Sequence, residues 1–435
     1  MERFALSRMK EWKENENRKP LIIRGARQVG KTWIMKTFGQ QYFEKTAYVN
    51  FDNNARMKQV FEGDLDIERL VLSISAETGV SIEAENTLII FDEVQEVPKA
   101  LTSLKYFYEN APQYAIVAAG SLLGVALHQG TSFPVGKVDF LDLYPLNFRE
   151  FLCAMGEKQF VSMLDSCDTQ MVTVFKTKYI ERLREYYFVG GMPEVVKDFS
   201  EKKDYNRVRA IQKNLINYYQ QDFSKHAEIK LVPRLNLVWN SIPMQLAKEN
   251  KKYIYGQVRE GSRAKDFELA IQWLLDCGLI HKVQRIQKPD FPLKAYIDFD
   301  AFKLFLVDIG LLIAMTDLDA KVIIEGNKIF TEFKGALTEQ YILQQLISDV
   351  GVIPYYYSTQ NSKGEIDFLV QGKTSVIPIE VKAEENLKAK SLKAFCEKYQ
   401  LSYAVRTSMS DYREQDWMTN IPLYAVKWIK NYVNQ

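Results

Sequence analysis

The sequence predicts an α/β protein with three parts: an N-terminal domain built on a parallel sheet, a helical middle domain, and a small C-terminal α/β domain. Apolar strand-like runs alternate with helical segments in residues 1–203. Helical spacing dominates residues 204–325, and short strands flanked by helices return in residues 326–435. A chain of 435 residues, at about 150 residues per domain, is expected to form two to four domains.

The first element is an apolar strand that runs into a glycine-rich turn, "LIIRGARQVGKTWI". It matches G-x-x-x-x-G-K-[ST] without a mismatch, and a helical segment follows. In this motif backbone N–H groups surround phosphates, Lys31 meets the β- and γ-phosphates, and the Thr32 hydroxyl holds Mg²⁺. The expected nucleotide-binding residues are Gly25, Ala26, Arg27, Gln28, Val29, Gly30, Lys31, Thr32 and Trp33.

A second apolar strand, "NTLIIFDEVQEV", ends in an acidic pair. Asp92 is placed to hold Mg²⁺ and Glu93 to polarise the attacking water. An acidic pair at a strand end can also cap a helix, but the phosphate-binding motif upstream favours a nucleotide site. The next strand, "YAIVAAGSLL", ends at Ser121, our candidate for contacting the γ-phosphate. Three such strands predict a P-loop NTPase sheet with helices on both faces.

Five segments occur in order: "IIRGARQVGKTWIM", "LIIFDEVQ", "VAAGSLLG", "DFLDLYPLNFREFL" and "YYFVGGMPEVV". Together they resemble the prokaryotic AAA-type ATPases, related to the archaeal-type ATPases, that carry an appended domain of unknown function. The resemblance spans nearly the whole chain, and "LYPLNFREF" and "VGGMPE" are its most distinctive parts. It implies ATP and Mg²⁺ as ligands.

One departure from that family concerns an arginine finger. The family usually has Gly-Arg before the "LYPL" segment, and this chain has Gly136-Lys137. Lysine lacks the planar fork with which arginine meets a phosphate. A finger acting across a subunit boundary of a homo-oligomer is therefore left open, with Arg149 as one substitute.

The middle part is basic and helical. Residues 201–265 carry 14 Lys and Arg against 6 Asp and Glu, which fits either a solvated helical face or a nucleic-acid contact. Helices followed by the strand "LIHKVQRI" suggest a winged helix, and the family resemblance implies the same. Arg259, Arg263 and Lys265 begin the candidate recognition helix, where contacts to DNA would form. The alternative is a lid or a protein contact beside the nucleotide domain. The run "FKLFLVDIGLL" is interpreted as buried core.

The C-terminal part predicts a helix ("GALTEQYILQQLISDV"), a three-stranded meander, a second helix ("SLKAFCEKYQL") and further strands at "SYAVRTS" and "PLYAVK". This order resembles that of the PD-(D/E)xK nuclease-like superfamily, which implies a restriction-endonuclease-like fold. Its motif is present as Asp367 on one strand and Glu380-x-Lys382 on the next, with Glu339 on the leading helix.

The spacing of these residues fits metal chemistry. Alternation along a strand places Glu380 and Lys382 on one face, where Asp367 and Glu380 would hold Mg²⁺ or Mn²⁺. Glu339 is a further candidate ligand, and Glu365 would be either a ligand or a solvated charge. Lys382 would orient or deprotonate the water that the metal activates.

Bulk composition restricts localisation and partners. The net charge is +2, so any nucleic-acid binding must come from local charge. Four scattered cysteines without a CxxC pattern suit a reducing cytoplasm. The charged N-terminus lacks the apolar core of a signal peptide, and the most apolar run is short for a bilayer. We expect a cytoplasmic protein with no membrane partner.

The main functional expectation is an ATPase coupled to a nuclease-like domain that acts on or holds nucleic acid. The alternative is a nucleotide-switched regulatory protein whose nuclease-like domain is inactive and binds a protein. The sequence does not identify the biological process or the partner.

Overall fold

The computed structural model describes residues 1–434 except 121–132, 249–250, 325–330, 360–363 and 386–388. It divides into two compact units. The N-terminal unit contains Glu2–Tyr144 and Trp273–Leu279. The C-terminal unit contains Met1, Pro145–Gln272 and Ile280–Gln435.

The N-terminal unit is built on a five-stranded sheet in the order β2-β3-β4-β1-β5. All of its strand pairs are parallel. The strands are β1 (Leu21–Arg24), β2 (Lys45–Asn50), β3 (Thr87–Asp92), β4 (Ala115–Ala119) and β5 (Asp139–Asp142). The three predicted strands are β1, β3 and β4, which confirms the parallel α/β class.

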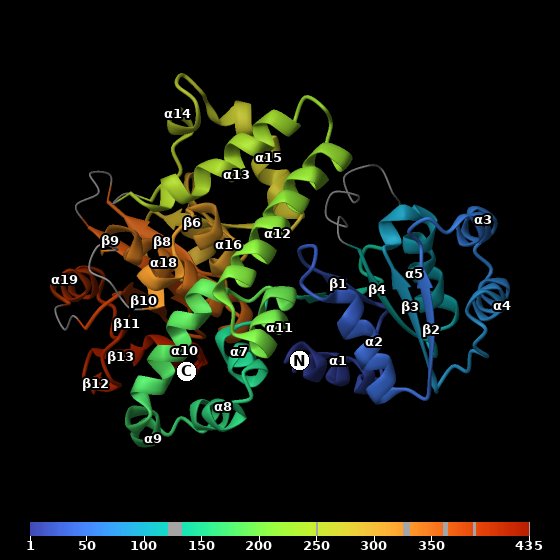
Figure 1. Ribbon diagram of the computed structural model, residues 1–435, viewed down its shortest axis with the longest axis horizontal. Helices are drawn as coiled ribbons and strands as arrows, with labels where there is room; N and C mark the ends of the chain where they lie inside the picture. Colours follow the sequence, from blue (N-terminus) through green and yellow to red (C-terminus); the bar gives the residue numbers. More distant parts are fainter. Residues whose placement is uncertain (121–132, 249–250, 325–330, 360–363, 386–388, 435) are drawn as a thin grey trace. The chain divides into compact units, whose positions relative to one another are not determined.

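Helices cover both faces of this sheet (Figure 1). They are α1 (Ala5–Glu14), α2 (Lys31–Tyr42), α3 (Ala55–Glu62), α4 (Ile67–Thr78) and α5 (Pro98–Asn110), with a short 3₁₀ turn, η1 (Val94–Glu96). On one face α3, α4 and α5 bury their apolar side chains against the strands, and Phe51, Phe61 and Phe91 pack edge to face there. On the other face α1 packs on α2 through Trp12 and Phe38. Both faces of the central strands are therefore buried, as their continuous apolar runs predict.

The C-terminal unit begins with helices, and these start at Phe148, ahead of residues 204–325, in which helical spacing was expected to dominate. These are α7 (Phe148–Ala154), α8 (Lys158–Asp165), α9 (Thr169–Val174), α10 (Lys176–Val189), α11 (Pro193–Lys202), α12 (Tyr205–His226), α13 (Val232–Leu246), α14 (Tyr255–Val258) and α15 (Ala264–Asp276). The last of these, α15, ends at Asp276, and its final residues from Trp273 onward belong to the N-terminal unit. Gly278 follows it with a φ of 69°, which suits the left-handed residue after a helix. Further along lie α16 (Ile309–Met315), α17 (Ala320–Ile324), α18 (Thr331–Gln345), α19 (Lys390–Tyr399) and α20 (Ile429–Val433).

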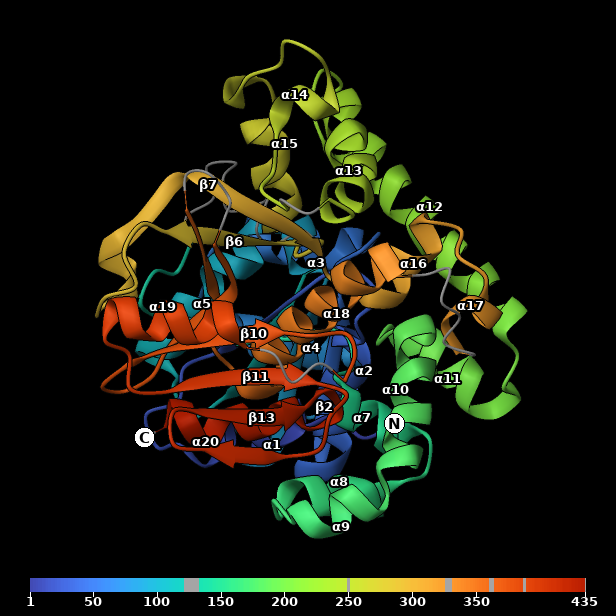
Figure 2. The ribbon, with the colours of Figure 1, turned by 90° about the vertical axis from the view of Figure 1, so that its left-hand side faces the viewer.

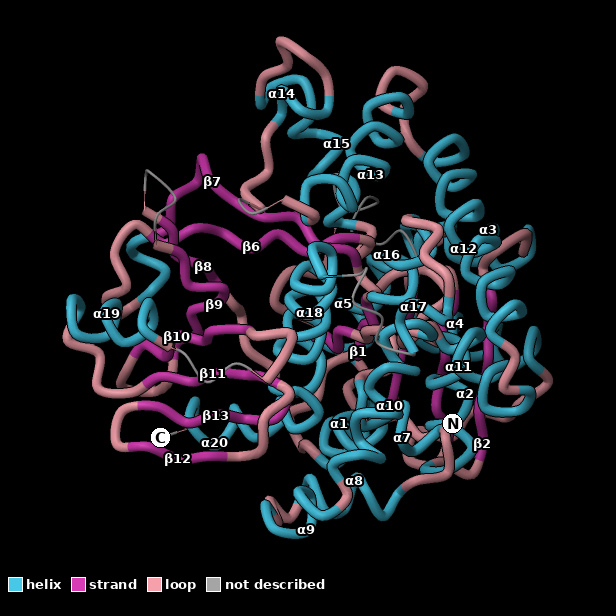
Figure 3. Tube along the Cα trace, turned by 60° about the vertical axis from the view of Figure 1, so that its left-hand side comes forward, coloured by secondary structure: helices cyan, strands magenta, loops and turns pink. Residues whose placement is uncertain are grey.

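An eight-stranded mixed sheet runs through this unit in the order β12-β13-β11-β10-β9-β8-β6-β7. Figure 3 shows the strands side by side in this order. They are β6 (Ile280–Ile286), β7 (Ile297–Leu306), β8 (Tyr355–Ser358), β9 (Glu365–Gln371), β10 (Val376–Val381), β11 (Ala404–Ser408), β12 (Arg413–Gln415) and β13 (Met418–Pro422). The hairpin β6–β7, which comes from the middle of the chain, joins the sheet because β6 pairs in parallel with β8 at Arg285 and Tyr356.

The predicted order of the C-terminal elements is present except in one place. Strands β8, β9 and β10 form the antiparallel meander, α19 packs on the sheet (Figure 2), and β11 pairs in parallel with β10. The predicted strand "PLYAVK" is wrong, because these residues enter a 3₁₀ helix, η5 (Leu423–Trp428). All of Leu423–Val426 is buried, so the segment has no apolar periodicity that could separate a helix from a strand.

Segments that distinguish the family resemblance meet in a buried polar network. The backbone N–H of Gly191 donates to Asp308 Oδ2 at 2.6 Å, and Tyr186 donates to the carbonyl of Leu146 at 2.6 Å. Gln344 Nε2 lies 3.0 Å from the Tyr186 hydroxyl. A Cβ on Gly191 would lie 2.1 Å from the Leu146 carbonyl oxygen, so only glycine fits there. These segments are therefore in direct contact through buried hydrogen bonds.

Two further expectations concern the whole chain. Among the residues that the structure describes, no helix is both long enough and apolar enough to span a bilayer. The cysteines at 153, 167, 277 and 396 are free thiols.

Candidate nucleotide site and a second charged site

The predicted phosphate loop connects the end of β1 to the start of α2. Three of its residues have positive φ: Gly25 at 147°, Gln28 at 63° and Gly30 at 95°. A Cβ on Gly25 would lie 2.2 Å from the carbonyl oxygen of Leu143. A side chain at position 25 would collide with this carbonyl, so the loop can take its path only with glycine there. The loop leads directly into the N-terminus of α2, where backbone N–H groups are available to bind an anion.

Lys31 is the first residue of α2 and is 7% exposed. Its Nζ donates to the carbonyl oxygens of Gly25 at 2.9 Å and Ala26 at 2.8 Å. Burial lowers the pKa of Lys31 to about 8, against the opposing effect of Glu93 and Asp92. The structure thus places an ammonium group directly on the loop.

Thr32 and Asp92 lie together at the carboxyl end of the sheet. Thr32 Oγ1 donates to Asp92 Oδ2 at 2.7 Å, and the Tyr48 hydroxyl donates to the same oxygen at 2.9 Å. Burial, followed by the charge of Asp92, raises the pKa of Tyr48, so this phenol keeps its proton. A hydroxyl and a carboxylate are the oxygen donors that Mg²⁺ prefers, so these side chains fit the implied ion.

Glu93 follows Asp92 with a left-handed φ of 51°. Its backbone N–H donates to Asp92 Oδ1 at 3.1 Å, and Gln95 Nε2 donates to Glu93 Oε2 at 2.7 Å. The carboxylate that is proposed to act on water therefore has an amide partner two residues further on.

The other predicted loop residues have varied surroundings. Ala26 and Val29 are buried, Arg27 is partly buried, and Gln28 and Trp33 are exposed. Arg3, which the sequence did not single out, donates to the carbonyl oxygen of Val29 at 3.0 Å. The predicted γ-phosphate contact, Ser121, lies outside the described residues.

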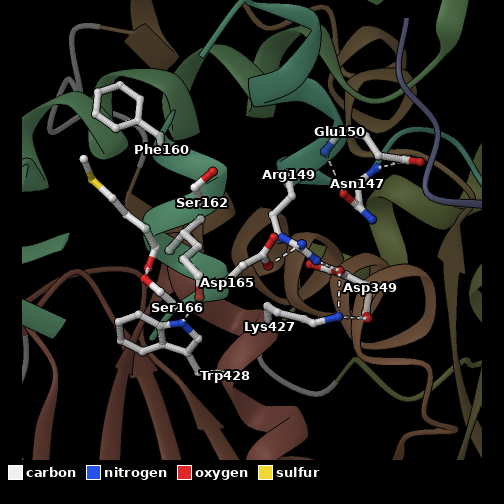
Figure 4. Close-up of polar contacts among 12 residues, drawn as sticks. Asn147, Arg149, Glu150, Phe160, Ser162, Asp165, Ser166, Asp349, Lys427 and Trp428 are labelled. Carbon is white, nitrogen blue, oxygen red and sulfur yellow. Dashed lines mark hydrogen bonds and ion pairs between the residues drawn. The ribbon is translucent and has the colours of Figure 1, made fainter. Parts of the chain in front are cut away.

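Arg149, the substitute considered for the finger, is buried and lies in an ion-pair cluster (Figure 4). Its guanidinium contacts Asp349 Oδ1 at 2.8 Å and Asp165, and Lys427 Nζ lies 3.5 Å from Asp349. Lys137 pairs with Glu109 at 3.0 Å. Arg149 of α7 therefore links α8 to the helical segment that follows α18.

The second predicted site lies on β9 and β10. Their antiparallel register pairs Phe368 with Ile379, which makes Asp367 and Glu380 the next pair. Lys382 Nζ contacts Glu380 Oε1 at 2.9 Å, and the backbone N–H of Val381 donates to Asp367 Oδ2 at 2.7 Å. The three motif residues are therefore neighbours in this sheet.

Glu339 of α18 reaches the same place. It forms an ion pair with Lys251, and its Oε2 lies 3.6 Å from Lys303 Nζ. Lys303 also pairs with Glu365. Burial, followed by the charge of Glu339, raises the pKa of Asp367 to about 7. Two lysines therefore contact the predicted metal ligands. Among the described residues, no group of three or more His, Cys, Asp or Glu side chains is arranged to hold a metal ion.

Sequence reasoning missed Tyr48 and Gln95 at the nucleotide site and Lys251 and Lys303 at the second site. A signal for Lys303 was present: it is the one charged residue in the apolar run "AFKLFLV". A buried cation requires an acidic partner, but the sequence does not say which acid.

Family models match three segments of the chain. Residues 17–152 match an AAA domain, residues 180–322 match a domain of unknown function (DUF8612), and residues 334–426 match another (DUF4143). Residues 17–152 are therefore an AAA-type P-loop ATPase domain, which confirms that part of the resemblance. The comparison with curated proteins gives no match.

Several solved archaeal structures are similar to this chain, each over 72% of its length. A Walker-type ATPase of Pyrococcus abyssi is 15% identical, with a TM-score of 0.44 over 95% of that chain. The Orc1 protein of Aeropyrum pernix, solved with DNA, is 13% identical, with a TM-score of 0.27 over 91% of that chain. Cdc6p of Pyrobaculum aerophilum is 10% identical, with a TM-score of 0.25 over 92% of that chain.

Proposed function

We propose that the protein binds Mg·ATP at residues 25–32 and hydrolyses it. The observation that carries this proposal is the contact between Thr32 Oγ1 and Asp92 Oδ2 at 2.7 Å, beside a loop that holds the Lys31 ammonium at 2.8 Å from the Ala26 carbonyl oxygen. The predicted phosphate loop, the Lys31 ammonium and two oxygen donors lie together at the carboxyl end of a parallel sheet, and this arrangement supports the proposal.

Each side chain has a distinct part in this reaction. The backbone N–H groups of the loop and the Lys31 ammonium bind the phosphates. Thr32 and Asp92 would hold Mg²⁺, which when bound neutralises charge on the phosphates. Tyr48 keeps Asp92 Oδ2 in place. Glu93 accepts a hydrogen bond from the attacking water and polarises it, and Gln95 orients the Glu93 carboxylate.

Two substitutions separate binding from hydrolysis. Lys31→Ala should abolish both, because the phosphates lose their cation. Glu93→Gln should keep ATP affinity and lower kcat by about 100-fold or more, the usual effect of losing a general base. Fluorescent-nucleotide titration and phosphate release measure the two properties. Turnover unchanged in Lys31→Ala would refute the assignment.

We further propose that hydrolysis is coupled to nucleic acid held by the C-terminal unit. Arg259, Arg263 and Lys265 support this proposal because all three are exposed around the start of α15. DNA should stimulate ATP turnover, more strongly at low salt, and changing all three residues to Ala should remove the stimulation. A matched control changes three exposed lysines of α19: Lys390, Lys393 and Lys398. Equal loss in both triple variants, or no stimulation by any DNA, would contradict the coupling.

A second candidate is a nucleotide-switched interaction protein with an inactive nuclease-like domain. It is favoured by the lysines that contact the acidic residues of β9 and α18. Plasmid cleavage that requires Mn²⁺ and disappears in Asp367→Ala would decide against it. In either case we place the protein in the cytoplasm, where free cysteines persist.

The proposal also includes a homo-oligomer, because an AAA-type site is often completed by a cation from a neighbouring copy. Arg149 is already paired with two carboxylates, so such a cation has to come from elsewhere. Sedimentation with and without Mg·ATP measures whether copies associate.

A further inference from the structure

The nuclease-like interpretation requires a surplus of negative charge on β9, β10 and α18. Two carboxylates hold a divalent cation because their combined charge offsets the ion's own. At a buried site, the balance between carboxylate and cationic charge determines whether a metal ion binds, because an uncompensated charge is costly there. The charged side chains around Asp367 therefore show whether a metal ion is required.

Four carboxylates gather at this place: Glu339, Glu365, Asp367 and Glu380. Four cationic side chains lie beside them: Lys251, Lys303, Lys382 and Arg406. Even with every carboxylate ionised, the charges of these described side chains cancel. These side chains therefore carry no excess negative charge for a divalent cation to neutralise.

Lys303 is the central member of this cluster. It is 0% exposed, although it comes from β7, in the hairpin that precedes the nuclease-like segment in the sequence. Its Nζ pairs with Glu365, lies 3.6 Å from Glu339 Oε2 and stands 4.7 Å from the ring of Tyr356. Burial alone would lower the pKa of Lys303, but Glu339, Glu365 and Asp367 raise it above its usual value.

The other cations complete the balance. Lys251 pairs with Glu339 from a second direction and is mostly buried, with 13% of its side chain exposed. Lys382 contacts Glu380 Oε1 at 2.9 Å. Arg406 of β11 is paired in register with Glu380 and donates from Nε to Asn420 Oδ1 at 2.9 Å. Glu339, Glu365 and Glu380 therefore each contact a lysine. Asp367 has no lysine of its own among the described residues, but the charges of Lys251 and Lys303 act on it.

We propose that this site is a metal-independent charge cluster, in which the ammonium groups of Lys251 and Lys303 stand where a nuclease would hold its divalent cation. The C-terminal domain then keeps a nuclease-like sheet without cleaving phosphodiesters. The inference rests on the proposed nuclease-like interpretation of this sheet and does not depend on ATP hydrolysis.

The deciding measurement is an Mn²⁺ titration of the full chain without nucleotide, followed by electron paramagnetic resonance of the free ion. We expect no bound Mn²⁺ that depends on Asp367 up to the millimolar range. One Mn²⁺ per chain that is lost in Asp367→Asn, and kept in the P-loop variant Asp92→Asn, would overturn the proposal. Phosphate release from ATP in the same samples tests the ATPase separately.

Variants then test whether the lysines exclude the ion. Lys303→Met should increase Mn²⁺ affinity at least tenfold, and adding Asp367→Asn should remove the gain. The matched control is Lys282→Met, an exposed lysine of the adjacent strand β6. Lys303→Met that folds and gains no affinity would contradict the proposal. If Lys303→Met fails to fold, Lys251→Met serves instead, because its side chain is less buried.

Discussion

Gly25 illustrates how one residue makes the phosphate loop possible. Its φ is 147° and an added Cβ would lie 2.2 Å from the Leu143 carbonyl oxygen, so alanine must move the backbone. Gly25→Ala should weaken ATP binding at least tenfold, measured by nucleotide titration. Gly256→Ala is the control, because a Cβ there meets no atom within 4 Å. Equal affinity in Gly25→Ala and the wild type would show that the loop path is not required.

Asp308 predicts a pH dependence of stability. Burial raises its pKa to about 6, although backbone N–H donors oppose the shift. A carboxyl with a raised pKa favours the folded state when protonated. Its contribution is therefore complete below about pH 4 and is lost as the pH rises through 6, which amounts to about 3 kcal/mol for a shift of about two units.

The measurement compares the wild type with Asp308→Asn in urea denaturation from pH 4 to pH 7. The variant lacks this titration, so the difference in unfolding free energy between the two proteins should change in favour of the variant as the pH rises. Parallel curves would mean that Asp308 keeps an ordinary pKa. Other carboxyl groups titrate in both proteins and cancel in the comparison.

Residues with a local sequence pattern were predictable, and residues whose role depends on tertiary contact were not. Lys31, Thr32 and Asp92 follow from strand, turn and spacing alone. Lys251 and Lys303 lie 88 and 36 positions from Glu339, so nothing local links them. Tyr48 reaches Asp92 because β2 and β3 are neighbours, a pairing that the sequence does not state.

At the scale of elements, Arg149 joins α7 to α8 and to the segment after α18. That segment is a short π-helical turn, η4 (Leu346–Val350), and it carries Asp349. Arg149→Met would leave the Asp349 carboxylate buried, with Lys427 as its remaining cation among the described residues. Removing one partner of a buried pair costs about 3–5 kcal/mol. Urea denaturation should show that loss, whereas ATP turnover per folded molecule should stay unchanged.

Lys178→Met provides the matched control, because Lys178 pairs with Glu181 on an exposed helix face. Such a pair contributes about 1 kcal/mol or less. A finger role for Arg149 would give the opposite pattern: full stability with lost turnover. The two measurements together therefore separate a structural arginine from one that acts on nucleotide.

Element types were predictable where apolar periodicity was clear, as in α12, α13, β9 and β10. The prediction failed at Leu423–Val426, where every side chain is buried and periodicity carries no information. The pairing of β6 with β8 could not be predicted from the sequence either, since β7, α16, α17, α18 and η4 lie between the two strands in the chain.

At the scale of the whole molecule, the division into two units predicts two unfolding transitions. Mg·ATP at about 100 times its Kd stabilises the unit that binds it by about 2.7 kcal/mol. In calorimetry only the transition of the N-terminal unit should move, and Lys31→Ala should abolish the movement. A single transition that moves as a whole would mean that the units unfold together.

The parallel pairing of β6 with β8 has a consequence for any attempt to study the C-terminal segment alone. The matched families meet between residues 322 and 334, and a fragment started there would lack both strands of the hairpin. Strand β8 would then become an open sheet edge, which invites association with other chains. It would also leave Glu339 and Glu365 without Lys303. A fragment that folds without aggregating needs to begin before Ile280. The segment matched by the C-terminal family model is therefore smaller than the segment that can fold on its own.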